Sequence, residues 1–255
     1  MTTIFKSLHD FHDHRYVLTT EKNLDRQESL KRELKGWDLE LLFGVDKSTV
    51  TKEQFQKDGI YDEQKAMETD RSGKPMTTGH ICCSLGHRLI YEEFLRTDHE
   101  KVLVFEDDVL ALPDAESKID KLVEAIPVDA EMIYWGWEGP GKAPAGASIK
   151  KALYHLQHKM GLLSYNHTMI DNLYPKPHSK YFSVAGKHFL AHAYTLTRSG
   201  AEKLIAWQTP IILNADNAIQ YAILNGDLKA YIAHTQVFSQ GSQESGHSIK
   251  SLTQT

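Results

Sequence analysis

The segment VLVFEDDVLALPD, at residues 102–114, constrains the fold more than any other. It begins with four consecutive apolar residues, a pattern typical of a strand that is covered on both faces in a mostly parallel sheet. Directly after this run come Glu106, Asp107 and Asp108. Three adjacent carboxylates repel one another and need solvent, a cation or positive neighbours to remain ionised. The segment therefore predicts a buried central strand that ends at a charged site.

Short apolar runs alternate with helical patterns along most of the chain. Strands are expected at residues 16–19, 39–45, 102–105, 132–135 and 192–196, and helices at 20–36, 77–95, 117–125, 199–207 and 216–224. Thr78 is a candidate N-cap for the second helix, and residues 47–76 should form short helical pieces and exposed loop. Because the connections are short enough for βαβ units, we predict a three-layer α/β domain with a mostly parallel central sheet.

The second half of the chain contains three further segments of distinct composition. Residues 137–148 are rich in Gly, Pro and Ala and should be loop. Residues 150–165 place apolar and basic side chains on opposite sides of a helix, which favours a helix packed on the core over a helix at a membrane edge. The polar tail at residues 239–255 should be disordered or fold over a site.

Composition narrows the functional classes. At 255 residues the chain can bury a full core, as one large domain or two small ones, and a net charge of −5 gives no electrostatic footprint for nucleic acid. An acidic protein can still hold an anionic substrate where the local site is basic. We see no apolar run near the roughly 20 residues that span a bilayer and no signal-peptide core. Cys82 and Cys83 are neighbours and make a poor disulfide framework, so a reducing cytoplasm is expected.

The histidines and cysteines are expected to have mainly structural roles. His9, His12 and His14 form the densest histidine group, for which a solvated face is favoured over a metal site. The two cysteines are expected to be small buried hydrophobes rather than nucleophiles. The Thr-Thr-Gly start of the helix at residues 77–95 would present free backbone N–H groups that suit an anion.

The acidic triplet suggests a metal site without establishing one. In open α/β sheets, ligands bind at the carboxyl ends of the strands. If the chain is still extended, Glu106 and Asp108 point to the same side and Asp107 to the other. Two carboxylates could then hold a divalent cation, with substrate phosphates and water completing its shell. A solvated acidic turn remains the alternative.

Several segments, in order, resemble one enzyme family. The segment YVLTTEKNLDRQESL, at residues 16–30, contains the Asp-Arg pair of the family's first motif. Residues 106–109 match another motif of the family, Glu-Asp-Asp-Val, in full. The segments GHICCSLGH and HAYTLTRSGAEKLI match two further motifs at Gly79, Ile81, Cys83, Leu85, His87, Tyr194, Thr197, Arg198, Gly200, Ala201 and Leu204. Together they are similar to glycosyltransferase family 25, the group of lipopolysaccharide and collagen galactosyl- or glucosyltransferases. The likeness runs from about residue 15 to 250, except for residues 137–190.

The chain departs from this family at a few positions. Thr19 and Thr20 replace an Asn-Leu pair, and His80, Cys82 and Gly86 differ within the second motif. The resemblance places Thr19, His80 and Gly86 around the donor pocket, where they would bear on the donor sugar, the metal dependence or the activity.

The resemblance implies a GT-A fold, a nucleotide-sugar donor such as a UDP-hexose, and a divalent cation, Mn²⁺ or Mg²⁺. A cation bridging the diphosphate would stabilise the charge that develops on the leaving nucleotide. Asp108 is the expected direct metal ligand and Glu106 a second one. Glu106 and Asp107 are also candidates for contact with the donor sugar or the ribose.

The remaining expected roles concern the donor and the acceptor. In an inverting transferase one carboxylate deprotonates the attacking hydroxyl, and Asp216 is the candidate, with a helix N-cap as its alternative role. Arg26 could hold the nucleotide or form a surface salt bridge. Thr19 and Gly79 belong to the expected donor pocket. For His87 we favour a structural or donor-contact role over acid–base work.

These inferences combine into one functional hypothesis. We expect a single GT-A-like domain over residues 1–255, with a nucleotide-sugar-binding half at about 1–136 and an acceptor-side half at about 137–255. It would transfer a galactose or glucose from a UDP-sugar to a hydroxyl of a glycan or glycolipid such as lipopolysaccharide, in the cytoplasm, with the basic helix as a candidate contact to the inner face of the membrane. The alternatives are a non-catalytic carbohydrate- or nucleotide-binding module and a metal-dependent phosphohydrolase.

Overall fold

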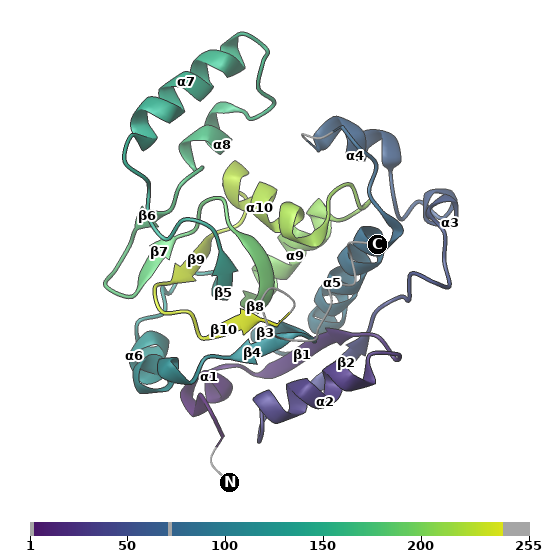
Figure 1. The fold of residues 1–255 in the computed structure, drawn as a ribbon, viewed down its shortest axis with the longest axis vertical. Helices are drawn as coiled ribbons and strands as arrows, with labels where there is room; N and C mark the ends of the chain where they lie inside the picture. The colour runs from purple at the N-terminus through teal and green to yellow at the C-terminus, as the bar shows by residue number, and fades with distance from the viewer. Residues whose placement is uncertain (1–2, 71–72, 242–255) are drawn as a thin grey trace.

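A computed structural model describes residues 3–70 and 73–241 and shows a central sheet with helices on both faces (Figure 1). The helices are α1 (Lys6–Phe11), α2 (Leu24–Glu33), α3 (Lys52–Lys57), α4 (Glu63–Thr69), α5 (Thr78–Arg96), the 3₁₀ helix η1 (Pro113–Lys118), α6 (Ile119–Glu124), α7 (Ala147–Lys159), α8 (His167–Asp171), α9 (Arg198–Trp207) and α10 (Ala215–Asn225). The strands are β1 (His14–Thr19), β2 (Glu40–Phe43), β3 (Lys101–Glu106), β4 (Val109–Ala111), β5 (Met132–Glu138), β6 (Lys176–Pro177), β7 (Phe182–Val184), β8 (Phe189–Thr197), β9 (Ala230–Ala233) and β10 (Phe238–Gln240).

Within the described residues the main sheet has the strand order β2-β1-β3-β8-β5-β9-β7-β6, and β4 pairs separately with β10. The pairs β1–β2, β1–β3 and β5–β9 are parallel, whereas β8 runs antiparallel to both β3 and β5. The sheet is therefore mixed, and the expectation of a mostly parallel sheet is wrong. The reason is that β5 and β8 are joined by a long excursion with its own short strands, and not by the single crossover helix that keeps neighbouring strands parallel.

Alternating side chains of the sheet pack into two separate hydrophobic cores, one on each face. On one face Val17, Leu103 and Phe105 pack with residues of α1, α2 and α6. On the other face Val102 and Val104 pack with residues of α5, α9 and α10. All four side chains of residues 102–105 are fully buried. This confirms the expected three-layer α/β arrangement and a central strand covered on both faces.

Most of the expected elements are present, with shifted boundaries. The predicted strands correspond to β1, β2, β3, β5 and β8, and the predicted helices to α2, α5, α6, α9 and α10. The N-cap of α5 is Thr77, whose hydroxyl accepts from the His80 N–H, so the assignment of that cap to Thr78 is wrong by one residue. Helices α1 and α8 and several short strands, including β9 inside the sheet, were not predicted from the sequence. Residues 242–255 of the predicted tail lie outside the described residues.

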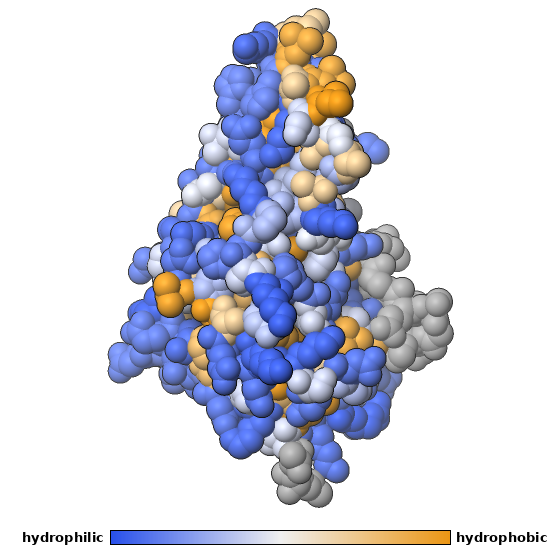
Figure 2. Space-filling view, turned by 90° about the vertical axis from the view of Figure 1, so that its left-hand side faces the viewer, coloured by the Kyte–Doolittle hydropathy of each residue, from blue (hydrophilic) through white to orange (hydrophobic). Residues whose placement is uncertain are grey.

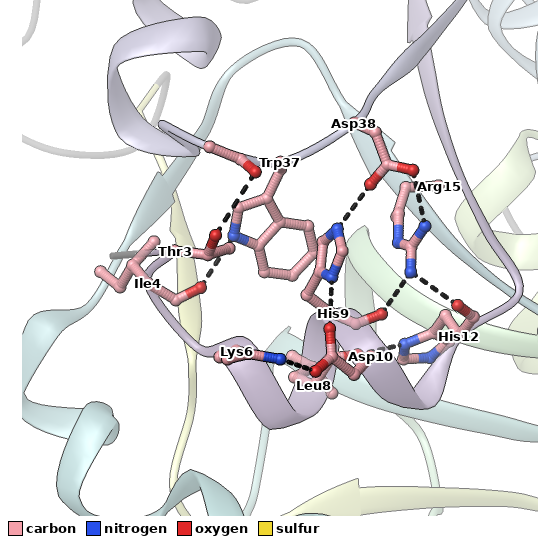
Figure 3. A network of polar contacts seen from close by, with 11 residues as sticks. Thr3, Ile4, Lys6, Leu8, His9, Asp10, His12, Arg15, Trp37 and Asp38 are labelled. Carbon is pink, nitrogen blue, oxygen red and sulfur yellow. Dashed lines mark hydrogen bonds and ion pairs between the residues drawn. The ribbon is translucent and has the colours of Figure 1, made fainter. Parts of the chain in front are cut away.

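Two members of the histidine group near the N-terminus, His9 and His12, belong to a network of polar contacts (Figure 3). His12 is buried; its Nδ1 lies 2.7 Å from the Leu8 carbonyl oxygen and its Nε2 lies 2.7 Å from the Thr195 hydroxyl. His9 contacts Asp38, which also accepts a 3.0 Å hydrogen bond from Arg15. The expectation of a solvated face is therefore wrong for His12, because the loop after α1 turns its ring under the sheet.

Helix α7 forms where a helix was expected, but it does not pack as expected. None of its side chains is buried, and the apolar residues Leu153, Leu156 and Met160 are more than half exposed. The prediction of a helix packed on the core through its apolar side is therefore wrong. Figure 1 shows α7 and α8 projecting from the body of the molecule. Among the described residues, no helix is both long enough and apolar enough to span a bilayer.

Candidate active site

A cavity of about 490 Å³ lies at one edge of the sheet. It is lined by residues at the carboxyl ends of β1 and β3, in the loop after β2, at the start of β8 and at the first turns of α5 and α10. Parallel strands end at the same edge, and β8 begins there because it runs the opposite way. The volume is within the range of small-molecule sites. Its position matches the rule that ligands bind beyond the carboxyl ends of the strands.

Glu106 and Asp108 face the same side of the chain at the end of β3. The side-chain amide of Gln240, from β10, lies 3.1 Å from the Glu106 carboxylate and 3.2 Å from that of Asp108. All three residues line the cavity. The two outer carboxylates converge as expected, but not through an extended chain: Asp107 and Asp108 form a turn after β3, and Asp107 lines the cavity as well.

Asp107 is held by residues of β1 and α2. Its carboxylate accepts hydrogen bonds from the Thr19 hydroxyl at 2.7 Å, the Asn23 amide at 2.9 Å and the Arg26 guanidinium at 2.7 Å. Asp107 and Arg26 are both largely buried, with side chains 6% and 14% exposed. Arg26 therefore forms a buried ion pair, not the surface salt bridge considered as its alternative role, and it lines the cavity as well.

His87 lies behind Glu106, outside the set of residues that line the cavity. Its Nδ1 is 2.9 Å from the Tyr194 hydroxyl, which also contacts the Tyr91 hydroxyl, and its Nε2 is 3.4 Å from Glu106. Burial lowers the pKa of His87 to about 4, so the ring is neutral near pH 7. A neutral ring held between Tyr194 and Glu106 can orient the Glu106 carboxylate.

Negative charges accumulate around Glu106. Burial raises the pKa of Glu106 well above its usual range, and the nearby carboxylates of Asp108, Asp216 and Asp107 raise it further, whereas Arg26 lowers it. A cation between these carboxylates would relieve the repulsion. This environment is one that favours binding of a positive ion.

Asp216 is brought to the same cavity from more than a hundred residues away in sequence. It lies in the first turn of α10, where its Oδ1 accepts a 2.9 Å hydrogen bond from the Ala191 N–H. The N-cap of α10 is Asn214, whose side chain accepts from the Asn217 N–H. The alternative role of Asp216 as an N-cap is therefore wrong.

The two cysteines line the cavity without being reactive thiols. Burial raises the pKa of Cys82 to about 11 and that of Cys83 well above its usual range. Both are therefore protonated near pH 7 and weak nucleophiles, as expected. Among the described residues, Cys83, His87 and Glu106 form a group whose ligand atoms lie within 4.8 Å of one another, close enough to hold a metal ion.

Positions that depart from the family motifs fall into two sets. Thr19 and His80 line the cavity, as does Gly79, another residue expected in the donor pocket. Gly86 is not part of the lining: a Cβ there would lie 2.6 Å from Cδ1 of Leu18, on the face of α5 that packs against β1. The expectation that Gly86 shapes the donor pocket is therefore wrong, and its small size serves helix–strand packing.

Several residues of the site were not singled out from the sequence, among them Gln240, Asn23 and Leu190. Gln240 was part of the polar tail, and Asn23 was treated as part of a helical pattern. Leu190, at the cavity, has a φ of +61°, a conformation that is strained for a residue with a Cβ. The strain could not be read from sequence, whereas the reading of the tail as folding over a site was a usable signal for Gln240.

The fold and the converging carboxylates place this protein among α/β proteins whose candidate ligand site lies beyond the carboxyl ends of the central strands. Comparison with known proteins is more specific. The pattern of glycosyltransferase family 25 (LPS biosynthesis protein) matches residues 12–219. The chain belongs to this family, and the resemblance seen in the motifs is confirmed.

Individual relatives are distant. An inactive glycosyltransferase 25 family member 3 from Homo sapiens is 26% identical over 200 residues, covering 77% of this chain and 29% of the relative. A procollagen galactosyltransferase 2 from Mus musculus is 29% identical over 129 residues, covering 49% of this chain and 20% of the relative. A glycosyltransferase 25 family member from Anopheles gambiae is 26% identical over 197 residues, covering 76% and 29%. The chain thus spans less than a third of the length of these relatives.

Proposed function

We propose that this chain is an active hexosyltransferase with GT-A-like organisation. It would take galactose or glucose from a UDP-sugar and transfer it, with inversion and with the help of a divalent cation, to a hydroxyl of a glycan or glycolipid such as lipopolysaccharide. The family supplies the reaction class. The observation that carries the proposal is the convergence of Glu106 and Asp108 on one side of a cavity that Asp216 also lines.

The donor atoms at this point fit a hard cation. Mn²⁺ and Mg²⁺ prefer oxygen ligands, and the carboxylates of Glu106 and Asp108 supply them. The side-chain oxygen of Gln240 is buried and has no hydrogen-bond partner within residues 3–70 and 73–241, while its nitrogen faces both carboxylates. Rotation of this amide by 180° would present the oxygen as a third ligand. The group of Cys83, His87 and Glu106 includes a thiol and an imidazole, which suit Zn²⁺ better.

The protein's own residues have distinct tasks in this proposal. When bound, the cation supplies positive charge beside the diphosphate as the nucleotide leaves. Asp108 and Glu106 would hold it, and His87 would orient Glu106. Lys22 and Lys47 line the cavity and can approach the phosphates, together with the backbone N–H groups at the start of α5. Asp216, oriented by the Ala191 N–H, would accept the proton of the attacking hydroxyl.

A second candidate is a non-catalytic module that binds a nucleotide sugar. It is favoured by the description of the human relative as inactive. Thr19 and His80, which differ from the family motifs, both line the cavity. Such a module would retain ligand binding and lack turnover.

Hydrolysis of UDP-galactose and UDP-glucose, followed as UDP release with and without Mn²⁺, tests the proposal. We expect slow, Mn²⁺-dependent release that falls by about 100-fold or more in Asp108→Asn, because one metal ligand loses its charge. Asp114→Asn is the matched control: it is an exposed aspartate of η1 and should leave the rate unchanged.

Other results would overturn the assignment. Thermal stabilisation by a UDP-sugar without turnover, including in the presence of a panel of glycan acceptors, would establish the binding module. Turnover of a simple phosphomonoester that depends on Asp108 would establish a phosphohydrolase. Equal rates for Asp108→Asn and Asp114→Asn would remove the acidic pair from the mechanism.

A further inference from the structure

Helix α7 turns its polar side to the protein and its apolar side outward. On the inner side, His155 contacts His167 at 2.8 Å and Asp171 at 3.0 Å, and the Lys151 ammonium donates a 2.7 Å hydrogen bond to the Asp171 carbonyl. On the outer side, Ile149 and Met160 are 78% and 63% exposed. This is the reverse of the usual orientation of an amphipathic surface helix.

The outward residues form one narrow stripe. Ile149, Leu153, Leu156 and Met160 follow the spacing i, i+4, i+7 and i+11, which at about 100° per residue confines them to roughly 60° of the helix circumference. Leu162, just past the helix, is 69% exposed and extends the apolar surface. Figure 2 shows this surface as the orange area at the narrow upper end of the molecule. A contiguous apolar area at a protruding end is typical of an interaction surface.

Positive charge borders the stripe on both sides. Lys150 and Lys159 are exposed and lie about 90° to either side of it. Residues 139–170 contain four lysines and not one Asp or Glu, in a chain whose net charge is −5. The segment is therefore strongly basic within an acidic protein, and its complement is an anionic surface.

We propose that the outward face of α7 docks on a bilayer that contains anionic phospholipids. The apolar stripe enters the boundary between head groups and acyl chains, and the flanking lysines contact the phosphates, as in other interfacial helices. A second copy of this chain fits less well, because two basic segments without carboxylates would face each other. Since α7 protrudes, it can reach a flat surface without hindrance from the body (Figure 1).

The proposed docking surface is connected to the cavity through packed helices. Residues of α8 pack against Leu224 of α10, and Tyr154 of α7 packs partly against the same cluster. The first turn of α10 carries Asp216 at the cavity. The docking surface is thus tied by packed side chains to the edge of the candidate site, although the proposal does not depend on the transferase activity.

Co-sedimentation with vesicles tests the docking. We expect the full chain to bind vesicles of phosphatidylcholine and phosphatidylglycerol at low salt, and to bind vesicles of phosphatidylcholine alone much less. The charge-reversed variant Lys150→Glu/Lys159→Glu and the stripe variant Leu153→Ser/Leu156→Ser should each weaken binding by at least about tenfold. Lys31→Glu/Lys35→Glu changes the net charge equally but lies near α2, at the opposite end of the molecule, and should bind like the wild type.

Two further measurements keep the outcome unambiguous. Because α7 has no buried side chain, the variants should unfold at the wild-type temperature, and Leu156→Trp should show blue-shifted emission on anionic vesicles. Equal binding by all variants, or no blue shift, would overturn the proposal. So would a concentration-dependent dimer that the stripe variant abolishes in sedimentation velocity, since a second copy would then cover the stripe.

Discussion

Asp107 and Asp108 are neighbours in sequence with different environments. Asp107 receives hydrogen bonds from Thr19, Asn23 and Arg26, which compensate its charge within the fold. Asp108 faces the cavity and shares the Gln240 amide with another carboxylate. Substitution of the first should therefore affect stability most, and substitution of the second should affect ligand binding most.

Arg26→Met tests the buried ion pair. Removing the guanidinium while keeping most of the side-chain volume leaves the Asp107 carboxylate buried with two neutral donors. Breaking a buried pair in this way lowers the free energy of unfolding by about 3 kcal/mol. Urea denaturation should detect the change, and Arg32→Met, on an exposed position of the same helix, should alter stability by less than about 0.5 kcal/mol. Equal effects of the two substitutions would contradict the assignment.

His12 predicts a pH dependence of stability. Its pKa is lowered to about 3 in the folded protein, chiefly by burial, from an ordinary value near 6.5. The unfolded chain therefore binds the proton first, so the contribution is complete above about pH 6.5 and is lost as the pH falls towards 3. The slope is about 1.4 kcal/mol per pH unit. In His12→Asn, the free energy of unfolding between pH 4 and 6.5 should fall less steeply with falling pH, by the slope that corresponds to about one proton. An unchanged slope would show that His12 is not the group responsible.

At the scale of elements, α5 and α9 approach their neighbours through glycines. A Cβ at Gly86 would meet the mobile end of the Leu18 side chain, 2.6 Å away. A Cβ at Gly200, in the first turn of α9, would lie 2.6 Å from the Glu131 carbonyl oxygen, which is backbone. The Leu18 side chain can rotate away, whereas the Glu131 backbone carbonyl cannot, so alanine should be tolerated better at position 86 than at position 200.

Alanine at each glycine measures that difference. Gly86→Ala should leave the free energy of unfolding within about 1 kcal/mol of the wild type, because Ala gains helix propensity and Leu18 can adjust. Gly200→Ala should cost about 2 kcal/mol. Thermal or urea unfolding of both variants gives the comparison. A larger loss at position 86 than at position 200 would mean that the contact with β1 is the rigid one.

The spacing of apolar and polar residues along the sequence specifies which side chains share one face of a strand or helix. It does not specify which face packs against the rest of the protein. Residues 102–105 predicted a doubly covered strand, and alternation predicted that Glu106 and Asp108 converge. Contacts between distant segments were not accessible: Arg26 and Asp107 are about eighty positions apart, and nothing local specifies their pairing. For α7 the helix and its stripe followed from spacing, yet its outward orientation depends on contacts with Asp171 that periodicity does not encode.

At the scale of the whole molecule, the two halves of the chain are interleaved. Strand β8 lies between β3 and β5, and β9 is on the other side of β5. Residues 1–136 therefore provide the neighbouring strands β2, β1 and β3, but β5 joins them only through β8, which the second half supplies. The division into a donor half and an acceptor half, if it holds for function, would not correspond to two units that fold separately.

Tryptic cleavage provides a test of this interleaving. Lys142 lies in an exposed loop between β5 and α7. We expect a nick there to leave the two fragments associated through the sheet, with a single unfolding transition and co-elution in gel filtration. A separately produced fragment of residues 1–136 should not show cooperative unfolding. Independent folding of that fragment would contradict the single-unit description.

The central position of β8 also has a consequence for synthesis of the chain. A ribosome makes β3 and β5 long before residues 189–197, so their facing edges remain unpaired while the intervening segment is translated. Such edges invite pairing with other chains. The nascent protein should thus need shielding by chaperones until β8 has left the exit tunnel, and arrested chains that end before it should be far more sensitive to protease than chains that extend past β9.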